Sequence, residues 1–234
     1  MYSNSKKKKC RLCSKLFSWL NPLLRQLGLI QPDCRSVFLR ASDNQRVRDV
    51  YTEAQNCSCE SSPISRHSPG IVQDNEILAL FIFSPMNVDR KGRVKPAVFS
   101  HVHEKGRSVQ RDDVADVDEL VKFSTDFLRG KDDRAWKGVL LGNVGLVRKL
   151  INFKGAQSVC VYDTAEQRNP AHAELFQSDD LDEADRVELR AELYDIFNGE
   201  NPVTPENYRS GHVWREVPIE LQQPEWMPFR IDSI

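Results

Sequence analysis

The chain has 234 residues, of which 40% are hydrophobic and 29% charged, and its formal net charge is −1. This composition is typical of a soluble globular protein and argues against an intrinsically disordered chain. No apolar run approaches the roughly 20 residues that a membrane-spanning helix needs, which argues against an integral membrane protein.

The charge is distributed unevenly. Residues 1–70 contain 12 Lys and Arg against 5 Asp and Glu, whereas residues 71–234 contain 21 against 29. A basic head suits a polyanion, either nucleic acid or an anionic membrane, although attraction between the two parts of the chain would also explain it. The predicted nucleic-acid contacts are Lys6, Lys7, Lys8, Lys9, Arg11, Arg35, Arg40, Arg46 and Arg48.

Five of the six cysteines lie in the first 60 residues. Cys10 and Cys13 have the spacing of a zinc knuckle, and Cys57 and Cys59 could supply a second pair of ligands. In a reducing cytoplasm, clustered cysteines bind metal more often than they form disulfides. The expectation is a structural zinc ion on these four residues, with free structural thiols as the alternative.

The N-terminal part predicts two short elements and a linker. Leucines recur at helical spacing over residues 16–27, and this helix could lie on a membrane surface or pack on the rest of the protein. Residues 36–51 form a second element, and the Ser, Pro and Gly of residues 52–70 indicate a linker. We therefore expect a basic Cys-rich module (1–60), a linker (61–70) and a domain (71–234). No small-residue cleavage site follows the N-terminal apolar run, so a cytoplasmic location is expected.

The domain predicts alternating strands and helices. Strands are expected over residues 76–83, 93–103, 139–141 and 158–163, and a helix over 113–129. Three helices are expected to begin at caps, at Asn143, at Asn169-Pro170 and, for residues 180–197, at Ser178. This order predicts an α+β fold with a small mixed sheet and three or four helices.

Two places in this domain favour acid–base chemistry. On a strand, His101 and His103 would share a face, which suits a metal or a proton-transfer pair, or simply a polar surface. His172 would lie in the first turn of the helix at Asn169-Pro170, with Asp163 at a nearby strand end to orient it. A residue that merely holds the loop is the alternative for His172.

The segment Glu104 to Arg111 favours anion binding. A turn at Gly106 is followed by Arg107, Ser108 and Arg111, whose side chains donate hydrogen bonds suited to phosphate or carboxylate. A solvated loop with Arg111 paired to a neighbouring aspartate is equally consistent. We predict that Arg111 and His172 line one pocket and bind an anion between them.

The order of these motifs is similar to one found in a family of small, uncharacterised bacterial proteins. That family pairs a Ser-Val-x-Arg segment, here Ser108 to Arg111, with a downstream Asn-Pro-Ala-His-Ala, here residues 169–173. The resemblance covers about residues 93–175 and implies that Ser108, Arg111, Asn169 and His172 belong to one constellation. It implies no particular reaction.

Three functions compete on this basis. The first is a bacterial nucleic-acid-associated accessory protein with an anion-binding pocket in its α+β domain. The second is an enzyme acting on a phosphate-bearing substrate, such as a nucleotide or an RNA end, in which Arg111, Arg107, Ser108 and Asn169 hold the anion. In that enzyme His172 or His103 would transfer the proton, and Asp163 would assist. The third is a peripheral membrane protein, and a protein partner is compatible with all three.

Overall fold

The computed structural model describes residues 33–42, 45–114, 116–178 and 181–210. The chain divides into two compact units, Met1–Asp33 and Cys34–Ile234, and the described elements all lie in the second. Lys6 to Lys9, Arg11, Cys10, Cys13 and the predicted helix over residues 16–27 lie outside the described residues. Within the described ranges, no helix is both long and apolar enough to cross a membrane.

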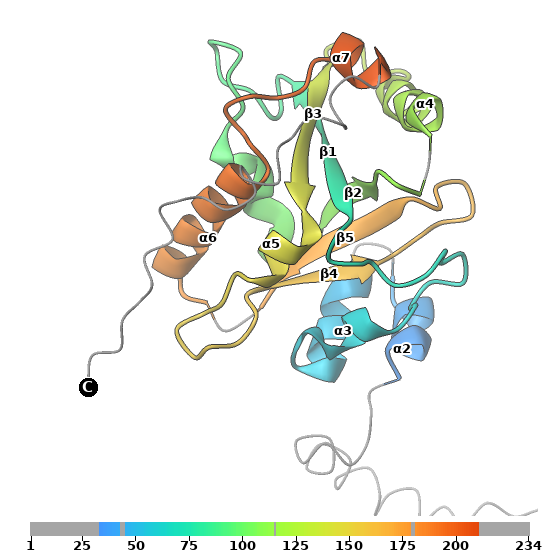
Figure 1. Cartoon of the computed structure of the whole chain (residues 1–234), viewed down its shortest axis with the longest axis vertical. Helices are drawn as coiled ribbons and strands as arrows, with labels where there is room; N and C mark the ends of the chain where they lie inside the picture. The colour runs from blue at the N-terminus through green and yellow to red at the C-terminus, as the bar shows by residue number, and fades with distance from the viewer. Residues whose placement is uncertain (1–32, 43–44, 115, 179–180, 211–234) are drawn as a thin grey trace, which may run out of the picture. The chain divides into compact units, whose positions relative to one another are not determined.

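Five antiparallel strands form one sheet in the order β3-β1-β2-β5-β4 (Figure 1). The α+β class is confirmed, and because every pairing is antiparallel the sheet is not mixed. The strands are β1 (Ile77–Ser84), β2 (Arg107–Arg111), β3 (Ala135–Asn143), β4 (Val159–Asp163) and β5 (His172–Gln177).

Strand β1, which lies between β3 and β2, is an unbroken apolar run, and it is buried along nearly its whole length. Alternate residues point to opposite faces of a sheet. Leu78, Leu80 and Ile82 therefore join the main core on the first face, whereas Phe81 and Phe83 contribute to a separate cluster on the second face. Helices cover both faces, which explains why this strand contains no polar alternation.

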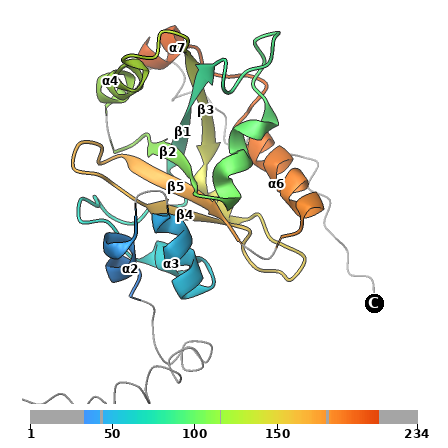
Figure 2. The ribbon, with the colours of Figure 1, turned by 180° about the vertical axis from the view of Figure 1, so that it is seen from behind.

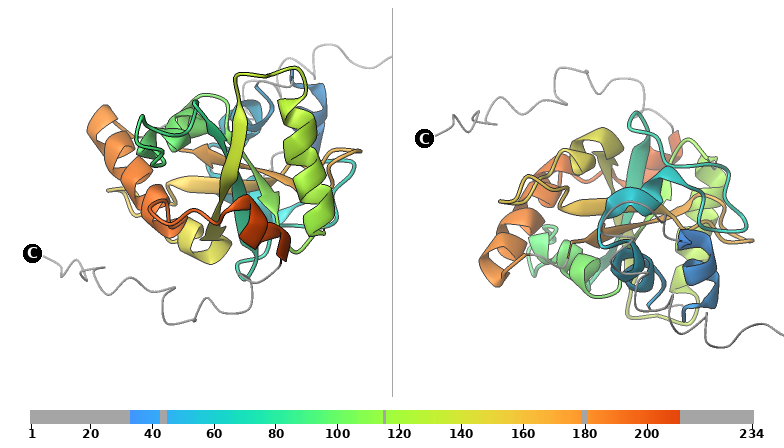
Figure 3. Two further views of the ribbon diagram at one scale, coloured as in Figure 1. Left: turned by 90° about the horizontal axis from the view of Figure 1, so that it is seen from above. Right: turned by 90° about the horizontal axis from the view of Figure 1, so that it is seen from below.

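The first face is covered by three elements. The 3-10 helix η2 (Pro96–His103), the short helix α5 (Val144–Arg148) and helix α6 (Glu183–Ile196) pack there, and Phe99 of η2 meets Phe197 after α6 with ring centroids 5.2 Å apart. η2 and α6 lie side by side in Figures 2 and 3.

Two groups of helices cover the second face. Helix α4 (Val117–Leu128) and α7 (Pro205–Ser210) pack over β1 and β3. At the other end of this face, α2 (Cys34–Arg40), α3 (Arg46–Ala54) and the 3-10 helix η1 (Cys57–Ser61) pack on β4 and β5. The two views of Figure 3 show the sheet between these layers.

Short polar side chains cap three of the helices. Asp116, Asn143 and Asp182 each accept a hydrogen bond from the backbone N–H three residues further on, at α4, α5 and α6. Such caps satisfy amides that have no partner within the helix. The prediction of Asn143 as a cap is confirmed, whereas α6 is capped by Asp182 instead of Ser178.

Two predicted elements are wrong. Residues 96–103 form η2 and no strand, since Pro96 at its first turn supplies no N–H to a ladder and suits a helix start. Asn169-Pro170 begins no helix, because Glu166 and Asn169 exchange backbone hydrogen bonds in a tight hairpin between β4 and β5. His172 is consequently the first residue of a strand.

The predicted module boundary also differs from the structure. Residues 34–61 belong to the same compact unit as the sheet, and two disulfides hold them, Cys34–Cys59 and Cys57–Cys160. Phe38 and Val50 of α2 and α3 are buried in one cluster with Tyr162 and Phe176 of the sheet. The segment predicted as a linker therefore connects two parts of one fold.

Candidate functional site

Arg111 is buried in an ion pair with Glu76 on the first face of the sheet. Its Nε and Nη2 donate to the two carboxylate oxygens of Glu76 at 2.7 and 2.8 Å, and its Nη1 and Nη2 donate to the carbonyls of Gly70 and Ile71. Asp163 lies 3.7 Å from Nη1. These partners occupy the guanidinium fork, so Arg111 holds the chain together and is not available to an external anion.

Arg111 and His172 do not line one pocket. Gln110 is directly paired with His172 across β2 and β5, so their side chains share the second face, and Arg111, the next residue, points to the first. Contacts agree with this register, because His172 Nδ1 bonds to Thr164, whereas Arg111 contacts Glu76 and lies near Asp163. The prediction of a shared anion pocket is therefore wrong.

The two other histidines of the predicted sites lie on a different element. His101 and His103 lie on η2 instead of a strand, and each is within 4 Å of the exposed Glu104. His101 Nδ1 and a Glu104 oxygen are 3.2 Å apart. This arrangement is a surface contact between two histidines and a glutamate rather than a paired-histidine site on a sheet.

Six polar side chains occupy one region of the second face, which we call the polar strip. Ser108 lies directly opposite Glu174, and Gln110 directly opposite His172. On the other side of β5, Tyr162 is paired with Glu174, and Thr164 bonds to His172 through its hydroxyl at 2.8 Å. The polar strip therefore consists of Ser108, Gln110, Tyr162, Thr164, His172 and Glu174.

The polar strip contains side chains with unsatisfied hydrogen-bonding groups. Gln110 Oε1 and the Tyr162 hydroxyl are buried and have no hydrogen-bond partner among the described residues. Ser108 is exposed, and His172 and Glu174 are half-buried. Since buried polar groups are normally hydrogen-bonded, this combination indicates a place where water or a ligand completes the set.

Burial alters the ionisation of the two titratable groups in the strip. It raises the pKa of Glu174 to about 8, with repulsion from Glu166 as a further cause and Arg46 acting in the opposite direction. It lowers the pKa of His172, against the attraction of Glu166. At neutral pH Glu174 is therefore mainly protonated and can donate a hydrogen bond, while His172 is neutral.

Arg46 of α3 is a cation whose charge acts on the strip. Its charge acts on both Glu174 and His172, and its guanidinium carbon lies 5.2 Å from the centroid of the Phe38 ring. The next residue, Val47, and Glu174 both lie close to Gly106, because a Cβ added to Gly106 would lie 2.7 Å from Val47 Cγ2 and 3.5 Å from Glu174 Oε1. Helix α3 thus places a guanidinium beside a sheet face that carries a protonated acid.

The remaining predicted ligand-binding residues lie elsewhere. Arg107 is paired with Leu175, so it points to the first face, where burial lowers its pKa to about 10. Asn169 is buried at the β4–β5 hairpin, its Nδ2 has no partner among the described residues, and it lines a pocket of about 470 Å³ with Arg168 and Lys122. Of the predicted constellation, only Ser108 and His172 share the strip.

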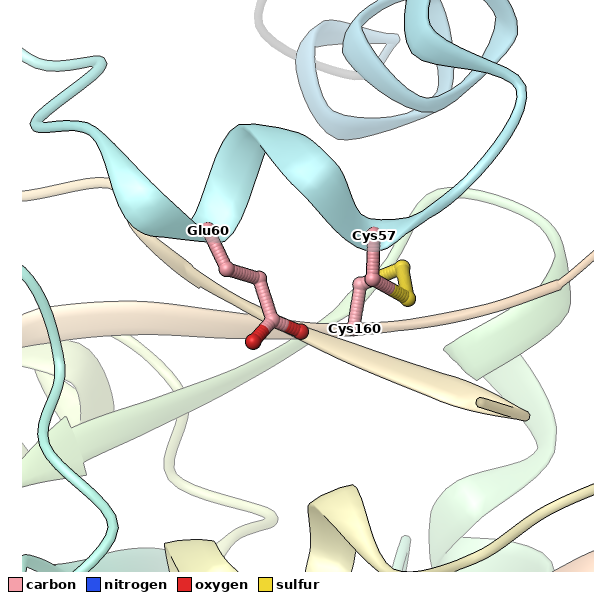
Figure 4. Close-up of side chains that lie close together, drawn as sticks. All are labelled: Cys57, Glu60 and Cys160. Carbon is pink, nitrogen blue, oxygen red and sulfur yellow. A yellow bond between two sulfur atoms is a disulfide. The ribbon is translucent and has the colours of Figure 1, made fainter. Parts of the chain in front are cut away.

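The cysteines form a second polar centre, shown in Figure 4. The sulfur atoms of Cys57 and Cys160 and a carboxylate oxygen of Glu60 all lie within 4.8 Å of one another. Cys57 and Cys59 are bonded to different cysteines, so they supply no thiolate pair to zinc in this structure. The zinc prediction would require both disulfides to be reduced, and its other two ligands lie outside the described residues.

Glu60 is held in place by three donors. Arg148 Nε donates at 2.6 Å, Gln157 Nε2 at 2.8 Å and the backbone N–H of Val161 at 2.5 Å. Burial nevertheless raises the pKa of Glu60, although Arg148 and these hydrogen bonds oppose that effect. The carboxyl beside the Cys57–Cys160 disulfide therefore has a raised pKa, which favours its protonated form.

Comparison with protein-family models, with curated proteins and with solved structures found no match to this chain.

Six residues of these sites are not among the predicted site residues: Gln110, Tyr162, Thr164 and Glu174 of the polar strip, and Glu60 and Cys160 of the second centre. His172 and Glu174 have the spacing of half of a zinc deaminase signature, but that signature also requires a downstream Pro-Cys-x-x-Cys, and no cysteine follows Cys160. The alternation from Ala171 to Phe176, small or apolar residues between His172 and Glu174, was the available signal for a strand. No signal in the chain pairs Cys160 with Cys57 or places Glu60 beside them.

Proposed function

We propose that this protein is a nucleic-acid-associated accessory protein that holds a phosphate group of its ligand beside the polar strip. The observation that carries this proposal is the position of Arg46, whose charge acts on both His172 and Glu174. An arginine presents a planar fork of donors that matches phosphate geometry. Ser108 and the protonated carboxyl of Glu174 add neutral donors on the same side, so the site favours an anion.

Exposed basic residues on the helix pair that carries Arg46 support the same ligand. Arg35, Arg40 and Arg48 are exposed on α2 and α3, the helix pair that also carries Arg46. Neutralising phosphates releases counterions, so affinity for a nucleic acid should fall steeply as salt is raised. The lysines at positions 6–9 add four positive charges to the same chain.

The test is binding of a labelled, 5′-phosphorylated single-stranded oligonucleotide to the full chain, measured by fluorescence polarisation at fixed salt. Arg46→Ala should weaken binding at least tenfold. Arg93→Ala is the matched control, because it removes an equal charge from an exposed ion pair with Asp89, and it should leave affinity within twofold. Equal effects of the two substitutions, or no binding by the unaltered protein, would overturn the proposal.

A second function is favoured by the fixed orientation of His172. Its Nδ1 bonds to the hydroxyl of Thr164, and among the described residues its Nε2 has no partner. An imidazole held through one nitrogen can transfer a proton through the other. We propose as the alternative an enzyme acting on a phosphate-bearing substrate, with Ser108 and His172 in contact with it. Product formed from a phosphorylated oligonucleotide, and lost in His172→Ala, would favour the enzyme over the binding protein.

We also propose a cytoplasmic location. Disulfides in a reducing cytoplasm are usually transient, catalytic or redox-sensing, whereas structural disulfides belong to oxidising compartments. The two disulfides therefore fit a cytoplasmic protein only if at least one of them is repeatedly reduced and reformed.

A further inference from the structure

The Cys57–Cys160 disulfide lies at a pocket, and its two cysteines differ in exposure. Cys57 is half-buried and lines a pocket of about 390 Å³, whereas Cys160 is fully buried in β4. The second disulfide differs, because Cys34 and Cys59 are both buried and neither lines this pocket. Of these four cysteines, a thiol entering the pocket therefore meets Cys57 first.

The lining of the pocket suits a polar, peptide-like thiol. Besides Cys57, it is formed largely by hydroxyl and amide side chains, those of Tyr51, Asn56, Ser58, Gln157 and Ser178. Tyr51 donates a hydrogen bond of 3.0 Å to Ser178 at this wall. Such groups can satisfy the amides and carbonyls of a short peptide, which a purely apolar pocket could not.

We propose that Cys57–Cys160 is a redox-active disulfide that exchanges with a peptide-like thiol bound in this pocket. This inference is independent of the nucleic-acid proposal, because it uses no residue of the polar strip. The oxidant is the protein disulfide itself, and the reductant is the incoming thiol.

The exchange proceeds in two balanced steps. The incoming thiol loses its proton and attacks Cys57 Sγ, a new S–S bond forms, and the Cys57–Cys160 bond breaks with its electron pair on Cys160 Sγ. Cys160 then takes up a proton, which balances the proton that the incoming thiol lost. A second thiol attacks the mixed disulfide and releases Cys57 as a thiol, so two thiols are oxidised to one disulfide while the protein gains two electrons and two protons.

Glu60 is the group positioned to move that proton. Its carboxylate oxygen lies within 4.8 Å of both sulfurs, and no other His, Cys, Asp or Glu belongs to this cluster among the described residues. Burial raises the pKa of Glu60, which favours a carboxyl able to give a proton to the thiolate leaving at Cys160. Glu60 is therefore a positioning and proton-carrying residue next to the reacting sulfurs.

The experiment treats the native full-length oxidised protein with reduced glutathione, quenches with acid, and maps thiols and mixed disulfides by peptide mass spectrometry. We expect glutathione first on Cys57, a free thiol on Cys160, and Cys34–Cys59 still intact when at least nine-tenths of Cys57–Cys160 has reacted. Glutathione first on Cys160, Cys34 or Cys59, or no reaction until denaturant is added, would overturn the proposal.

Glu60→Gln tests the proton transfer separately. The rate of exchange should fall at least fivefold and its pH profile should change shape, while Asp74→Asn, which removes the charge of the other carboxylate bound to Arg148, should leave both unchanged. The fraction folded is measured for each variant by circular dichroism before reaction. Identical pH profiles for the native protein and a folded Glu60→Gln would remove Glu60 from the mechanism.

Discussion

Arg111 and Glu76 form a bidentate ion pair between β2 and the residue just before β1, and both side chains are almost fully buried. The pair also fixes the backbone before β1, because Arg111 donates to the carbonyls of Gly70 and Ile71. Arginine is a residue type that suits anion recognition, but here the side chain of Arg111 stabilises the fold.

Removing one partner of this pair should be costly. Arg111→Met leaves Glu76 buried without its partner, and we expect a loss of about 3–5 kcal/mol in the free energy of unfolding. The double variant Arg111→Met with Glu76→Leu should recover much of that loss, because no unpaired charge remains buried. Urea denaturation of both variants measures this, and equal stabilities would contradict the account.

Glu174 should make stability fall as pH rises. Its pKa is about 8 in the folded protein and 4.5 in an unconstrained chain. Between these values the folded state keeps a proton that the unfolded state has lost, so stability decreases from about pH 5 towards pH 8, whereas below pH 4.5 there is no effect. The stability of Glu174→Gln relative to the unaltered protein should therefore rise over this range in urea melts at pH 5, 6.5 and 8. The exposed Glu188→Gln is the control and should show no such trend.

The same proton should affect ligand binding. A protonated Glu174 donates a hydrogen bond to an anion, whereas an ionised Glu174 repels it. Oligonucleotide affinity should therefore fall as pH is raised from 7 to 9, and Glu174→Gln should remove most of that dependence. A dependence that persists unchanged in Glu174→Gln would assign the titration to another group.

Gly142 should not tolerate a side chain. A Cβ at this position would lie 2.6–2.8 Å from three ring atoms of Phe197, which is buried between the sheet and α6. Overpacking of this kind costs about 1–3 kcal/mol. Gly142→Ala should lower the midpoint of thermal unfolding. Phe197→Leu should lower that midpoint by less when it is added to Gly142→Ala than when it is made in the unaltered protein. Strict additivity of the two substitutions would show that they do not meet.

The second disulfide should act on stability alone. Cys34–Cys59 closes a loop with a sequence separation of 25. Replacing both cysteines by serine should cost about 3 kcal/mol, mainly by freeing the unfolded chain. The reaction of Cys57 with glutathione should keep its rate in the folded variant. A slower reaction would mean that the two disulfides are coupled.

Local signals in the sequence predicted much of the fold. The apolar run of β1, the strand ending at Asp163 and the cap at Asn143 were all confirmed, because each depends on neighbouring residues. Asn169-Pro170 misled because the same pair suits a tight turn, and only the pairing of β5 with β2 and β4 decides between the two structures.

The sites were harder to predict than the fold, because they depend on long-range register. Ser108 and His172 were chosen for their chemistry, but a shift of one residue separates the face of His172 from that of Arg111. The Cys57–Cys160 bond joins positions 103 residues apart. Neither relationship can be predicted from the residues that are adjacent to these positions in the sequence.

On each of the two outer strands of the sheet, some backbone groups of the free edge have partners outside the sheet. On β3, Val139 exchanges two backbone hydrogen bonds with Val203, and on β4 the N–H of Val161 is bound by the Glu60 carboxylate while Gln157 donates to the carbonyl of Val159. Exposed strand edges are templates for edge-to-edge aggregation. We therefore expect Glu60 to limit self-association through this edge as well as lying beside the disulfide, and loss of its side chain should be visible as increased light scattering at high protein concentration.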